Sequence, residues 1–292
     1  MSAVVLAPFT TEGPYFATLA DFADDANLTA AAVADNRRAV LDGVPLRLTF
    51  NVYDVVGSVG TELANATVFL WHCDTKGVYG AVGLAQNPTN KEDTLGKKWL
   101  RSTQRTDANG VVTFNTIVPG WYGGRTLHFH VRVRLPSATT DSSFVITTQL
   151  MFRDALQVGL AQIQPYAAVT TPYVQLAQDM IYTRASASVG DRLLLNLVGD
   201  FATGFTSTFA LGIDRTATAA PGGGMGMPPG GSPPVRPRET AATTAPTTAA
   251  ATTTAVVSET SVPANTTLTN ATGRLAMITH TCMVVMVSAF LR

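Results

Sequence analysis

Residues 125–136, RTLHFHVRVRLP, alternate apolar with polar side chains over most of their length. Successive side chains of an extended strand point to opposite faces, so His128 and His130 share one face and the apolar residues beside them share the other. The stretch therefore predicts a β-strand with one apolar face for a core and two imidazoles on the opposite face.

Four other segments have the same β-branched or alternating character, and turn residues close most of them. They are VPLRLTFNVYDVVG (44–57), ATVFLWHCDTKG (66–77), GVVTFNTIVPG (110–120) and FVITTQLMF (144–152). Helical patterns are confined to residues 29–39 and 173–182. Short strands separated by turns are typical of a β-sandwich with loops at its rims. We therefore predict an all-β fold, an antiparallel β-sandwich with large loops, over residues 1–215.

Composition limits the classes of function that the chain can have. Of 292 residues, 46% are hydrophobic and 14% are charged, which is enough for a substantial core. Twenty Lys and Arg balance twenty Asp and Glu, so no overall charge attracts nucleic acid, an anionic membrane or an acidic substrate. A small neutral or weakly charged ligand is the more natural partner. The two cysteines, Cys73 and Cys282, have no zinc-type spacing.

The composition changes after residue 215. Residues 216–274 form a Gly/Pro-rich and then Ala/Thr-rich stretch that could bury no core, and we expect them to be a disordered stalk. Residues 275–292 are apolar but shorter than the roughly 20 residues that a membrane-spanning helix needs. The stalk, the small residues and the apolar end together resemble a lipid-anchor attachment signal. A tail-anchored helix and an accidental apolar end are the alternatives.

These features predict an extracellular or cell-surface protein that attaches to the membrane through a C-terminal lipid anchor. Asn-X-Thr sequons agree with secretion and occur at Asn27, Asn65, Asn265 and Asn270. Residues 1–16 lack the basic and apolar regions of a signal peptide. Either the amino terminus is incomplete or the protein is not exported.

Two neutral histidines at alternate positions of a strand can chelate one metal ion, although such a pair alone is more often structural. Its neighbours favour a metal. Tyr122 lies six residues before His128, after a Pro-Gly-Trp turn, and Tyr79 follows the strand predicted within residues 66–77. Each tyrosine lies at a strand end near a glycine.

At these residues the chain resembles the intradiol ring-cleavage dioxygenases, in particular their compact single-domain secreted forms. The matching stretches occur in the family's order and spacing. They are TEGPYF (11–16), WHCDTKGVY (71–79), LRSTQRTDANGVVTFNTIVPGWYGGRTLHFHV (100–131), TTQLMF (147–152) and LGID (211–214). Together they cover nearly all of the region predicted to be ordered.

The resemblance implies a cofactor, Fe(3+), and a set of site residues. The implied iron ligands are Tyr79, Tyr122, His128 and His130. The implied catalytic residues are Arg125, Gln149 and Tyr122, of which Tyr122 is the ligand released when the substrate binds. Taken singly, each residue also has a structural interpretation, as a half-buried aromatic, a surface cation, a strand-edge amide or a packed histidine.

The residue types suit the chemistry. Ferric iron is a hard Lewis acid that favours anionic oxygen and can deprotonate phenols, whose ordinary pKa is about 10. The resemblance implies that a catecholic aromatic is cleaved between its two hydroxylated carbons with O2, to give a muconate-type diacid without a reductant or an organic cofactor. The expected partners are therefore the catecholic substrate and O2, and no nucleic acid.

Other residues near these motifs are more natural as scaffold. Trp71, Asp74 and Gly77 are expected to position Tyr79. His72 is expected to be a packed or capping histidine, and Cys73 a buried small side chain. Tyr15 and Trp121 are candidates to line the substrate pocket.

The chain also departs from the family's pattern. Only two residues separate Tyr122 from Arg125, where the catechol-specific dimeric enzymes have a longer loop, and their long amino-terminal helical linker is absent. Gly80 stands where the family usually has serine, and Ser102 where it usually has glycine. None of these differences removes a ligand, but the shape of the pocket does not follow from those enzymes.

Two alternatives to catalysis fit the same strands. One is a surface or cell-wall-associated binding protein that retains the sandwich without turnover. The other is a transthyretin-like carrier, which would leave the tyrosine and histidine set without a role.

Overall fold

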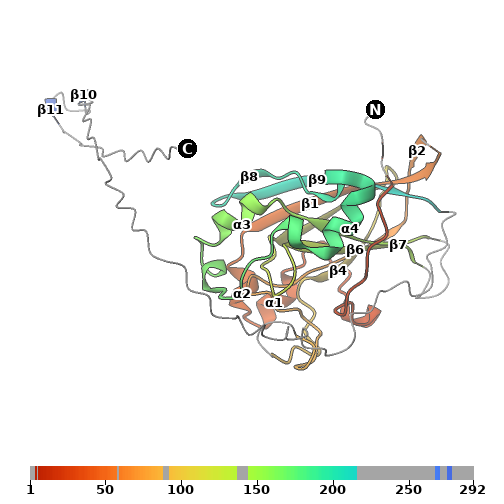
Figure 1. Ribbon diagram of the computed structural model, residues 1–292, viewed down its shortest axis with the longest axis horizontal. Helices are drawn as coiled ribbons and strands as arrows, with labels where there is room; N and C mark the ends of the chain where they lie inside the picture. Colours follow the sequence, from red (N-terminus) through yellow and green to blue (C-terminus); the bar gives the residue numbers. More distant parts are fainter. Residues whose placement is uncertain are drawn as a thin grey trace, which may run out of the picture. The chain divides into compact units, whose positions relative to one another are not determined.

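Two β-sheets form the frame of the protein, seen in the computed structural model of Figure 1. The structure describes residues 4, 6–57, 59–87, 92–136, 144–215, 267–269 and 275–277. The chain divides into two units, Met1–Gly231 and Ser232–Arg292. In the second unit only a short antiparallel pair is described, β10 (Thr267–Thr269) with β11 (Leu275–Met277). Apart from these strands, the predicted stalk and apolar end lie outside the described residues.

The first sheet is built around β1 (Pro45–Val56). On one side β1 pairs in parallel with β9 (Gly204–Ile213), which in turn pairs with β8 (Val198–Asp200). On the other side it pairs antiparallel with β5 (Val111–Ile117) along its first half and with β2 (Val59–Glu62) along its second half. The long strand β1 therefore pairs with β2, β5 and β9, and β8 joins the sheet through β9.

The second sheet is antiparallel throughout. Its order is β4 (Arg101–Arg105), β3 (Thr67–Trp71), β6 (His128–Arg134) and β7 (Phe144–Met151). Figure 1 shows β1, β8 and β9 in the upper layer and β4, β6 and β7 in the lower one. The predicted all-β sandwich is confirmed, and each of the five predicted segments contains a strand. The β1–β9 pair is parallel, unlike the antiparallel pairs predicted, and the long stretch of chain between the two strands supplies the connection that parallel pairing requires.

The helices differ in detail from the prediction. In place of one helix over residues 29–39 there are two short ones, α1 (Ala30–Ala34) and α2 (Arg38–Leu41), separated by Asn36 in the left-handed region at φ 46°. The second predicted helix starts later than expected, as α4 (Met180–Val189). The remaining helices are α3 (Asp154–Leu160) and the 3-10 turns η1 (Leu19–Asp21), η2 (Tyr166–Ala168), η3 (Leu176–Gln178) and η4 (Gly190–Leu193).

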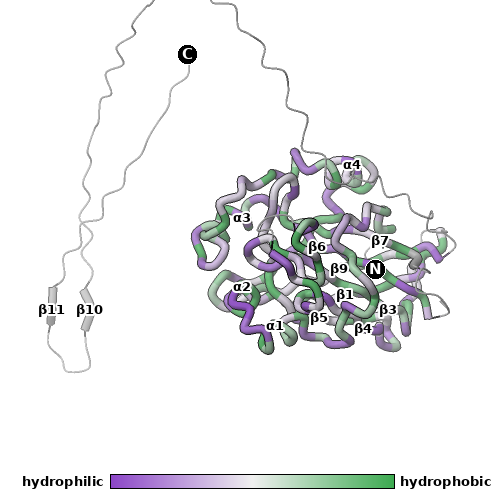
Figure 2. Tube along the Cα trace, turned by 90° about the horizontal axis from the view of Figure 1, so that it is seen from below, coloured by the Kyte–Doolittle hydropathy of each residue, from purple (hydrophilic) through white to green (hydrophobic). Residues whose placement is uncertain are grey.

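The main core lies between the two sheets. Leu48, Phe50 and Val52 of β1 and Phe129 and Val131 of β6 are all fully buried there. Along β1 these residues alternate with more exposed ones, and Figure 2 shows hydrophobic and hydrophilic residues interspersed along the traces of the strands.

The second sheet is buried on its outer face as well. An aromatic cluster covers that face, and its members are Tyr15, Phe22, Phe69, Trp71, Tyr79 and Tyr122 together with Cys73 and Val82. Tyr15 and Phe22 belong to the amino-terminal segment. The predicted polar face of β6 is therefore closed off from solvent, and His128 and His130 are 2% and 0% exposed.

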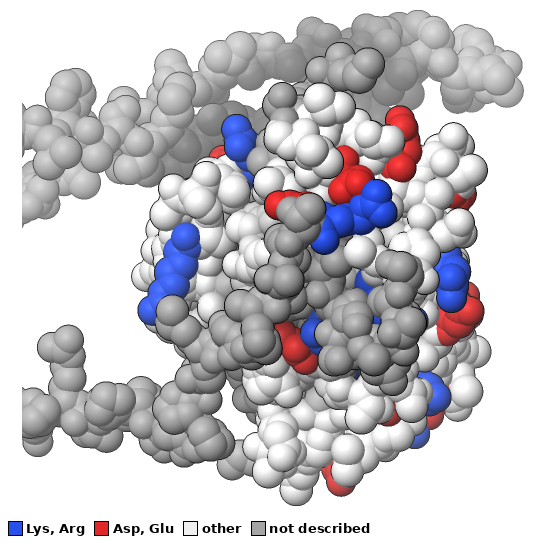
Figure 3. Space-filling view, turned by 90° about the vertical axis from the view of Figure 1, so that its right-hand side faces the viewer, with Lys and Arg blue, Asp and Glu red and all other residues white. Residues whose placement is uncertain are grey.

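Charged side chains of both signs are interspersed on the face drawn in Figure 3. This agrees with the balanced composition. Within the part of the chain that the structure describes, no helix has both the length and the apolar character to cross a membrane.

Candidate metal centre

Two tyrosines and two histidines meet on the outer face of the second sheet. His128 and His130 come from β6, Tyr79 follows β3 after a loop, and Tyr122 precedes β6 in a second loop. His130 pairs in register with Trp71 of β3, and the two rings stack with centroids 4.8 Å apart and an interplanar angle of 12°. The structure thus brings together the four residues that the resemblance implied as ligands.

The four polar atoms lie within a few ångströms of one another. The phenolic oxygen of Tyr79 is 3.1 Å from Nε2 of His130, 3.3 Å from Nε2 of His128 and 3.5 Å from the phenolic oxygen of Tyr122. The phenolic oxygen of Tyr122 is in turn 3.1 Å from Nε2 of His128. Tyr79 is fully buried, and Tyr122 is 5% exposed.

Two glycines let the tyrosine loops touch. Gly77 has φ +79°, and a Cβ on it would lie 2.4 Å from the carbonyl oxygen of Trp121. A Cβ on Gly120 would lie 2.2 Å from the carbonyl oxygen of Thr75. Because neither glycine carries a side chain, the loop before Tyr79 packs backbone against backbone on the loop before Tyr122.

Asp74 holds the loop that leads to Tyr79. Its buried carboxylate accepts hydrogen bonds from the backbone N–H groups of Lys76 (2.8 Å) and Val78 (3.0 Å). Arg37 donates to the other carboxylate oxygen from Nε (3.0 Å) and Nη2 (2.5 Å). This ion pair also explains the break between α1 and α2, since Arg37 turns inward at that point.

The backbone of Tyr79 is fixed on its other side by Asn87 and Thr94. The side-chain oxygen of Asn87 accepts from the N–H of Tyr79 at 3.3 Å, and its amide nitrogen donates to the carbonyl of Tyr79 at 3.2 Å. The hydroxyl of Thr94 donates to the same carbonyl at 2.6 Å. The position of the phenol therefore rests on a well-bonded loop.

Arg125 and Gln149, which the resemblance implies as catalytic residues, both lie next to the cluster. Nη1 of Arg125 is 3.5 Å from Nε2 of His128, and Nη2 donates to Oε1 of Gln149 at 2.5 Å. Nε of Arg125 donates to the carboxylate of Asp179 at 2.8 Å. Gln149 donates to the carbonyl of Thr11 at 2.7 Å, so β7 is tied to the amino-terminal segment.

Burial dominates the protonation equilibria of the four residues. It raises the pKa of Tyr79 and of Tyr122 well above the usual value for a phenol, and Arg125 opposes the shift at both. It lowers the pKa of His128 to about 3 and that of His130 well below its usual value, with Arg125 adding to both effects. Both imidazoles are therefore neutral near pH 7 and present lone pairs.

The cluster fits a cation bound at its centre. A phenol has one proton, so Tyr79 cannot donate at once to Tyr122, His128 and His130, which all crowd its oxygen. Nδ1 of His128 lies 2.7 Å from the carbonyl of Thr126, which favours the tautomer whose Nε2 lone pair points at the tyrosines. Donor atoms about 2.1 Å from one metal ion lie about 3 Å apart, close to the spacing found here.

Two aromatic residues near the cluster differ in their roles. Tyr15 stacks on Tyr79 with ring centroids 4.4 Å apart and meets Tyr122 edge-on at 5.8 Å, so it covers the site directly. Trp121 faces the core instead and donates through Nε1 to the carbonyl of Thr171 at 2.8 Å.

His72 and Cys73 lie beside the site without joining the four polar atoms. His72 is fully buried, with Nδ1 2.8 Å from the carbonyl of Cys73 and Nε2 2.7 Å from the hydroxyl of Thr116. Cys73 is a buried free thiol. These are the scaffold roles that the sequence favoured.

Besides Asn87 and Thr94, sequence reasoning missed two further buried residues that hold the site. Asp179 bonds to Arg125 from the start of α4, and an acidic residue before a helical pattern is a recognisable N-cap signal. Arg101 is 1% exposed and donates to three carbonyls, those of Gly80 (2.9 Å), Phe16 (2.7 Å) and Tyr15 (2.5 Å). It thereby ties the segment that covers the site to the residue after Tyr79, and no local pattern signals this role.

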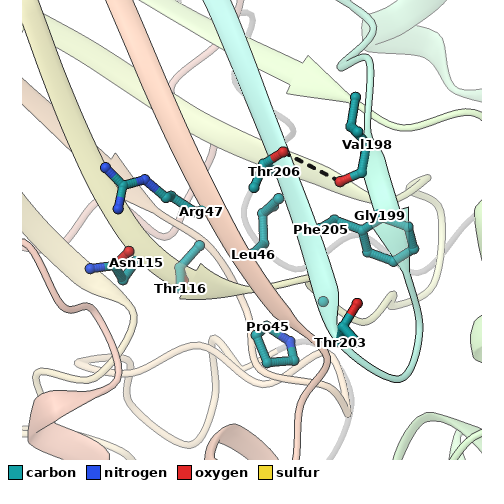
Figure 4. A pocket seen from close by; sticks show the side chains of 11 residues that line it. Pro45, Leu46, Arg47, Asn115, Thr116, Val198, Gly199, Thr203, Phe205 and Thr206 are labelled. Carbon is teal, nitrogen blue, oxygen red and sulfur yellow. Dashed lines mark hydrogen bonds between the residues drawn. The ribbon is translucent and has the colours of Figure 1, made fainter.

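A separate groove of about 430 Å³ lies on the other sheet (Figure 4). Its lining residues are Pro45, Leu46, Arg47, Asn115, Thr116, Val198, Gly199, Thr203, Gly204, Phe205 and Thr206. This lining contains one cation and no carboxylate, imidazole or phenol. The groove therefore lacks the carboxylate, imidazole and phenol groups that usually bind transition metals or act as general acids and bases.

Comparison with known proteins agrees with the fold. A family model described as Dioxygenase matches residues 11–164, more than half of the chain. Among curated proteins, none matches this chain. A solved intradiol ring-cleavage dioxygenase from Tetranychus urticae shares the fold, with a TM-score of 0.58, 24% sequence identity and coverage of 74% of this chain and 98% of its own.

Two further solved structures are less similar in shape. The dioxygenase domain of a dioxygenase carbohydrate-binding protein fusion from Streptomyces sp. SirexAA-E has 26% identity and a TM-score of 0.46, with 72% and 99% of the two chains covered. A mutant of catechol 1,2 dioxygenase from Acinetobacter radioresistens has 20% identity and a TM-score of 0.46, with 74% and 64% covered. The matched segment contains Tyr79, Tyr122, His128, His130, Arg125 and Gln149. The chain belongs to the intradiol ring-cleavage dioxygenase family.

Proposed function

We propose that this protein is a ferric-iron dioxygenase that cleaves a catecholic ring between its two hydroxylated carbons. The overall reaction adds both atoms of O2 to the catechol and gives a muconate-type diacid, so it needs no external reductant. One observation carries the proposal. The phenolic oxygens of Tyr79 and Tyr122 and the Nε2 atoms of His128 and His130 form a buried cluster whose linked members are 3.1 to 3.5 Å apart.

The same four residues would hold the iron. Ferric iron, when bound, would supply the Lewis acidity that lowers the pKa of the two phenols and the electron-accepting capacity that lets a catechol react with O2. Two tyrosinates offset much of its positive charge, while two neutral histidines add donors without further charge. Burial of all four residues excludes competing water and strengthens each interaction.

Tyr122 is the residue that we assign to proton transfer. It is slightly exposed, whereas Tyr79 is fully buried and bonded along its backbone to Asn87 and Thr94. In this proposal the phenolate oxygen of Tyr122 swings away from the cluster and accepts a proton from a hydroxyl group of the catechol. Tyr79 keeps its place throughout.

Arg125 stabilises negative charge on the ring oxygens of the deprotonated substrate. Its Nη1 already lies beside His128, and Asp179 and Gln149 hold its other two nitrogens. Tyr15 covers the cluster and separates the reacting atoms from solvent.

The test is turnover by the iron-loaded protein. We expect O2 to be consumed in a one-to-one ratio with catechol, and mass spectrometry to show a ring-opened diacid that contains both atoms of labelled O2. A matched pair of variants separates the site from the scaffold, since His128→Gln and His72→Gln both replace a buried histidine. His128→Gln should lose iron and activity, whereas His72→Gln should keep both when assayed near pH 7.

The binding-protein alternative predicts a different result. A protein that retains the site without turnover would bind iron and catechol but consume no O2. That outcome would overturn the proposed function and leave the assigned ligands standing.

A further inference from the structure

Asp179 is a carboxylate that bonds directly to Arg125, and it comes from outside the segment that the family model matches. It stands directly before α4 and is fully buried, although a buried carboxylate is stable only when it is well bonded. One oxygen accepts from the backbone N–H groups of Ile181 (2.9 Å) and Tyr182 (3.0 Å) and so caps the helix.

The second oxygen of Asp179 faces the site. It accepts from Nε of Arg125 at 2.8 Å and from the backbone N–H of Thr126 at 2.9 Å. Thr126 also presents its carbonyl to Nδ1 of His128 at 2.7 Å. One carboxylate oxygen therefore fixes both the guanidinium and the backbone of the residue that orients an imidazole.

The segment before Asp179 is itself anchored to the same loop. The hydroxyl groups of Tyr173 and Thr126 are 2.7 Å apart, and that of Tyr173 also donates to Asp154 at 2.9 Å. Trp121 adds its bond to Thr171. The position of Asp179 is thus fixed by the start of α4 after it and by the anchored segment before it. It does not depend on the bond to Arg125.

Arg125 has no freedom left in this arrangement. Nε is bonded to Asp179 and Nη2 to Gln149, so the guanidinium plane is fixed with Nη1 toward His128. Without the carboxylate of Asp179, the bond to Gln149 would be left to hold the guanidinium of Arg125. A single hydrogen bond does not fix the orientation of the guanidinium plane.

We propose that Asp179 is a positioning residue, which acts on the reaction chiefly by setting the orientation of Arg125 toward the reacting atoms. This proposal rests on the proposed function for its kinetic consequence. The claim that Asp179 fixes the orientation of Arg125 does not depend on the proposed function.

The geometric part is tested in the iron-free protein. The Nε–H of Arg125, followed by nitrogen-resolved NMR, should exchange with solvent slowly in the wild type, since it is buried and bonded to a carboxylate. In Asp179→Asn and Asp179→Ser it should exchange at least about tenfold faster, because each variant has one side-chain oxygen in place of two and cannot both cap α4 and accept from Arg125. Ser retains an oxygen that caps α4, so the helix remains anchored in that variant.

Asp191→Asn is the matched control. Asp191 is 64% exposed, pairs with Arg153 and accepts from the hydroxyl of Tyr182, so these bonds go to side chains at the start of α3 and in α4 and not to Arg125. It should leave the exchange of Arg125 and the kinetic constants unchanged. Rapid exchange of the Arg125 Nε–H in the wild type would overturn the proposal without any variant.

The kinetic part uses the iron-loaded protein with catechol. Asp179→Asn should lower kcat by about 100-fold while the iron content and the ferric absorption band stay as in the wild type. Adding Arg125→Lys to Asp179→Asn should cause little further loss, whereas independent roles would multiply the two effects. Multiplied effects, or an unchanged kcat, would refute the positioning role.

A wild type that consumes no O2 would refute the proposed function instead. The exchange of Arg125 would still decide whether Asp179 holds it. The two failures are therefore distinguishable.

Discussion

The Nε2 atom of His128 lies 3.1 Å from the phenolic oxygen of Tyr122, although a turn and a strand start separate the two residues. Tyr122 belongs to the loop before β6 and His128 is the first residue of that strand. The loop between them is short, and it also places Arg125 beside both. A single stretch of ten residues from Trp121 to His130 therefore supplies half of the tyrosines, both histidines and the guanidinium.

The close contact between the two tyrosine loops predicts the effect of a small substitution. Gly120→Ala places a Cβ against the carbonyl of Thr75, so the loops must separate. We expect a loss of roughly 1–3 kcal/mol in the free energy of unfolding and weaker iron binding, measured by urea denaturation and by metal analysis. Gly123→Ala is the control in the same loop, because its Cβ would meet only Thr171 at an ordinary 3.8 Å. Equal behaviour of the two variants would contradict the packing argument.

The bonding of Arg125 predicts that its charge alone is insufficient. Arg125→Lys keeps the positive charge but cannot bond to Asp179, Gln149 and the reacting atoms at the same time. We expect iron binding and colour to persist while kcat/KM for catechol falls by roughly 100-fold. Arg153→Lys makes the same change in an exposed ion pair and should have no such effect. An active Arg125→Lys enzyme would show that only charge matters.

Much of the β-sandwich could be predicted from the sequence, because the alternation of apolar and polar residues within a segment marks it as a strand. The alternation in residues 125–136 predicts β6 and the shared face of its two histidines, since a strand has a period of two. It does not predict that this face is also buried. That depends on Tyr15 and Phe22, which approach from a distant part of the chain.

The predicted bounds of the helices were wrong because contacts between distant parts of the chain also decide where a helix ends. The Ala-rich pattern in residues 29–39 favours one helix, but Arg37 turns inward to Asp74 and tertiary bonding outweighs the local preference. Asp179 can be read as a cap, yet its partner Arg125 lies far away in sequence. The ligand set itself depended on resemblance, because spacing alone does not bring Tyr79 to β6.

Burial of His72 predicts a pH dependence of stability. The pKa of His72 is lowered to about 3 by burial, whereas it is about 6.5 in an unfolded chain. Between these values the unfolded state binds the extra proton, so the free energy of unfolding falls as the pH falls below about 6.5. His72→Gln should reduce this slope by up to about 1.4 kcal/mol per pH unit, measured by urea denaturation of iron-free protein from pH 7 to pH 5. Identical slopes would mean that His72 titrates normally.

The C-terminal segment carries a prediction about location. If residues 275–292 are a lipid-anchor signal, a eukaryotic host that exports the protein should hold it on the membrane, and a phosphatidylinositol-specific phospholipase should release it. A chain truncated after residue 274 should be secreted freely. Detection of residues 275–292 in the mature membrane-bound protein by mass spectrometry would count against the anchor.

The most direct test of the central claim is titration of the purified, metal-free protein with ferric iron. Binding at Tyr79 and Tyr122 predicts one iron per chain and a burgundy absorption band from tyrosinate-to-iron charge transfer. Tyr79→Phe should lower the iron content and weaken and shift the band, since only the Tyr122 phenolate remains, while Tyr53→Phe, which changes a tyrosine of β1 outside the cluster, should do neither. A colourless protein whose iron content does not change in Tyr79→Phe would contradict the assignment.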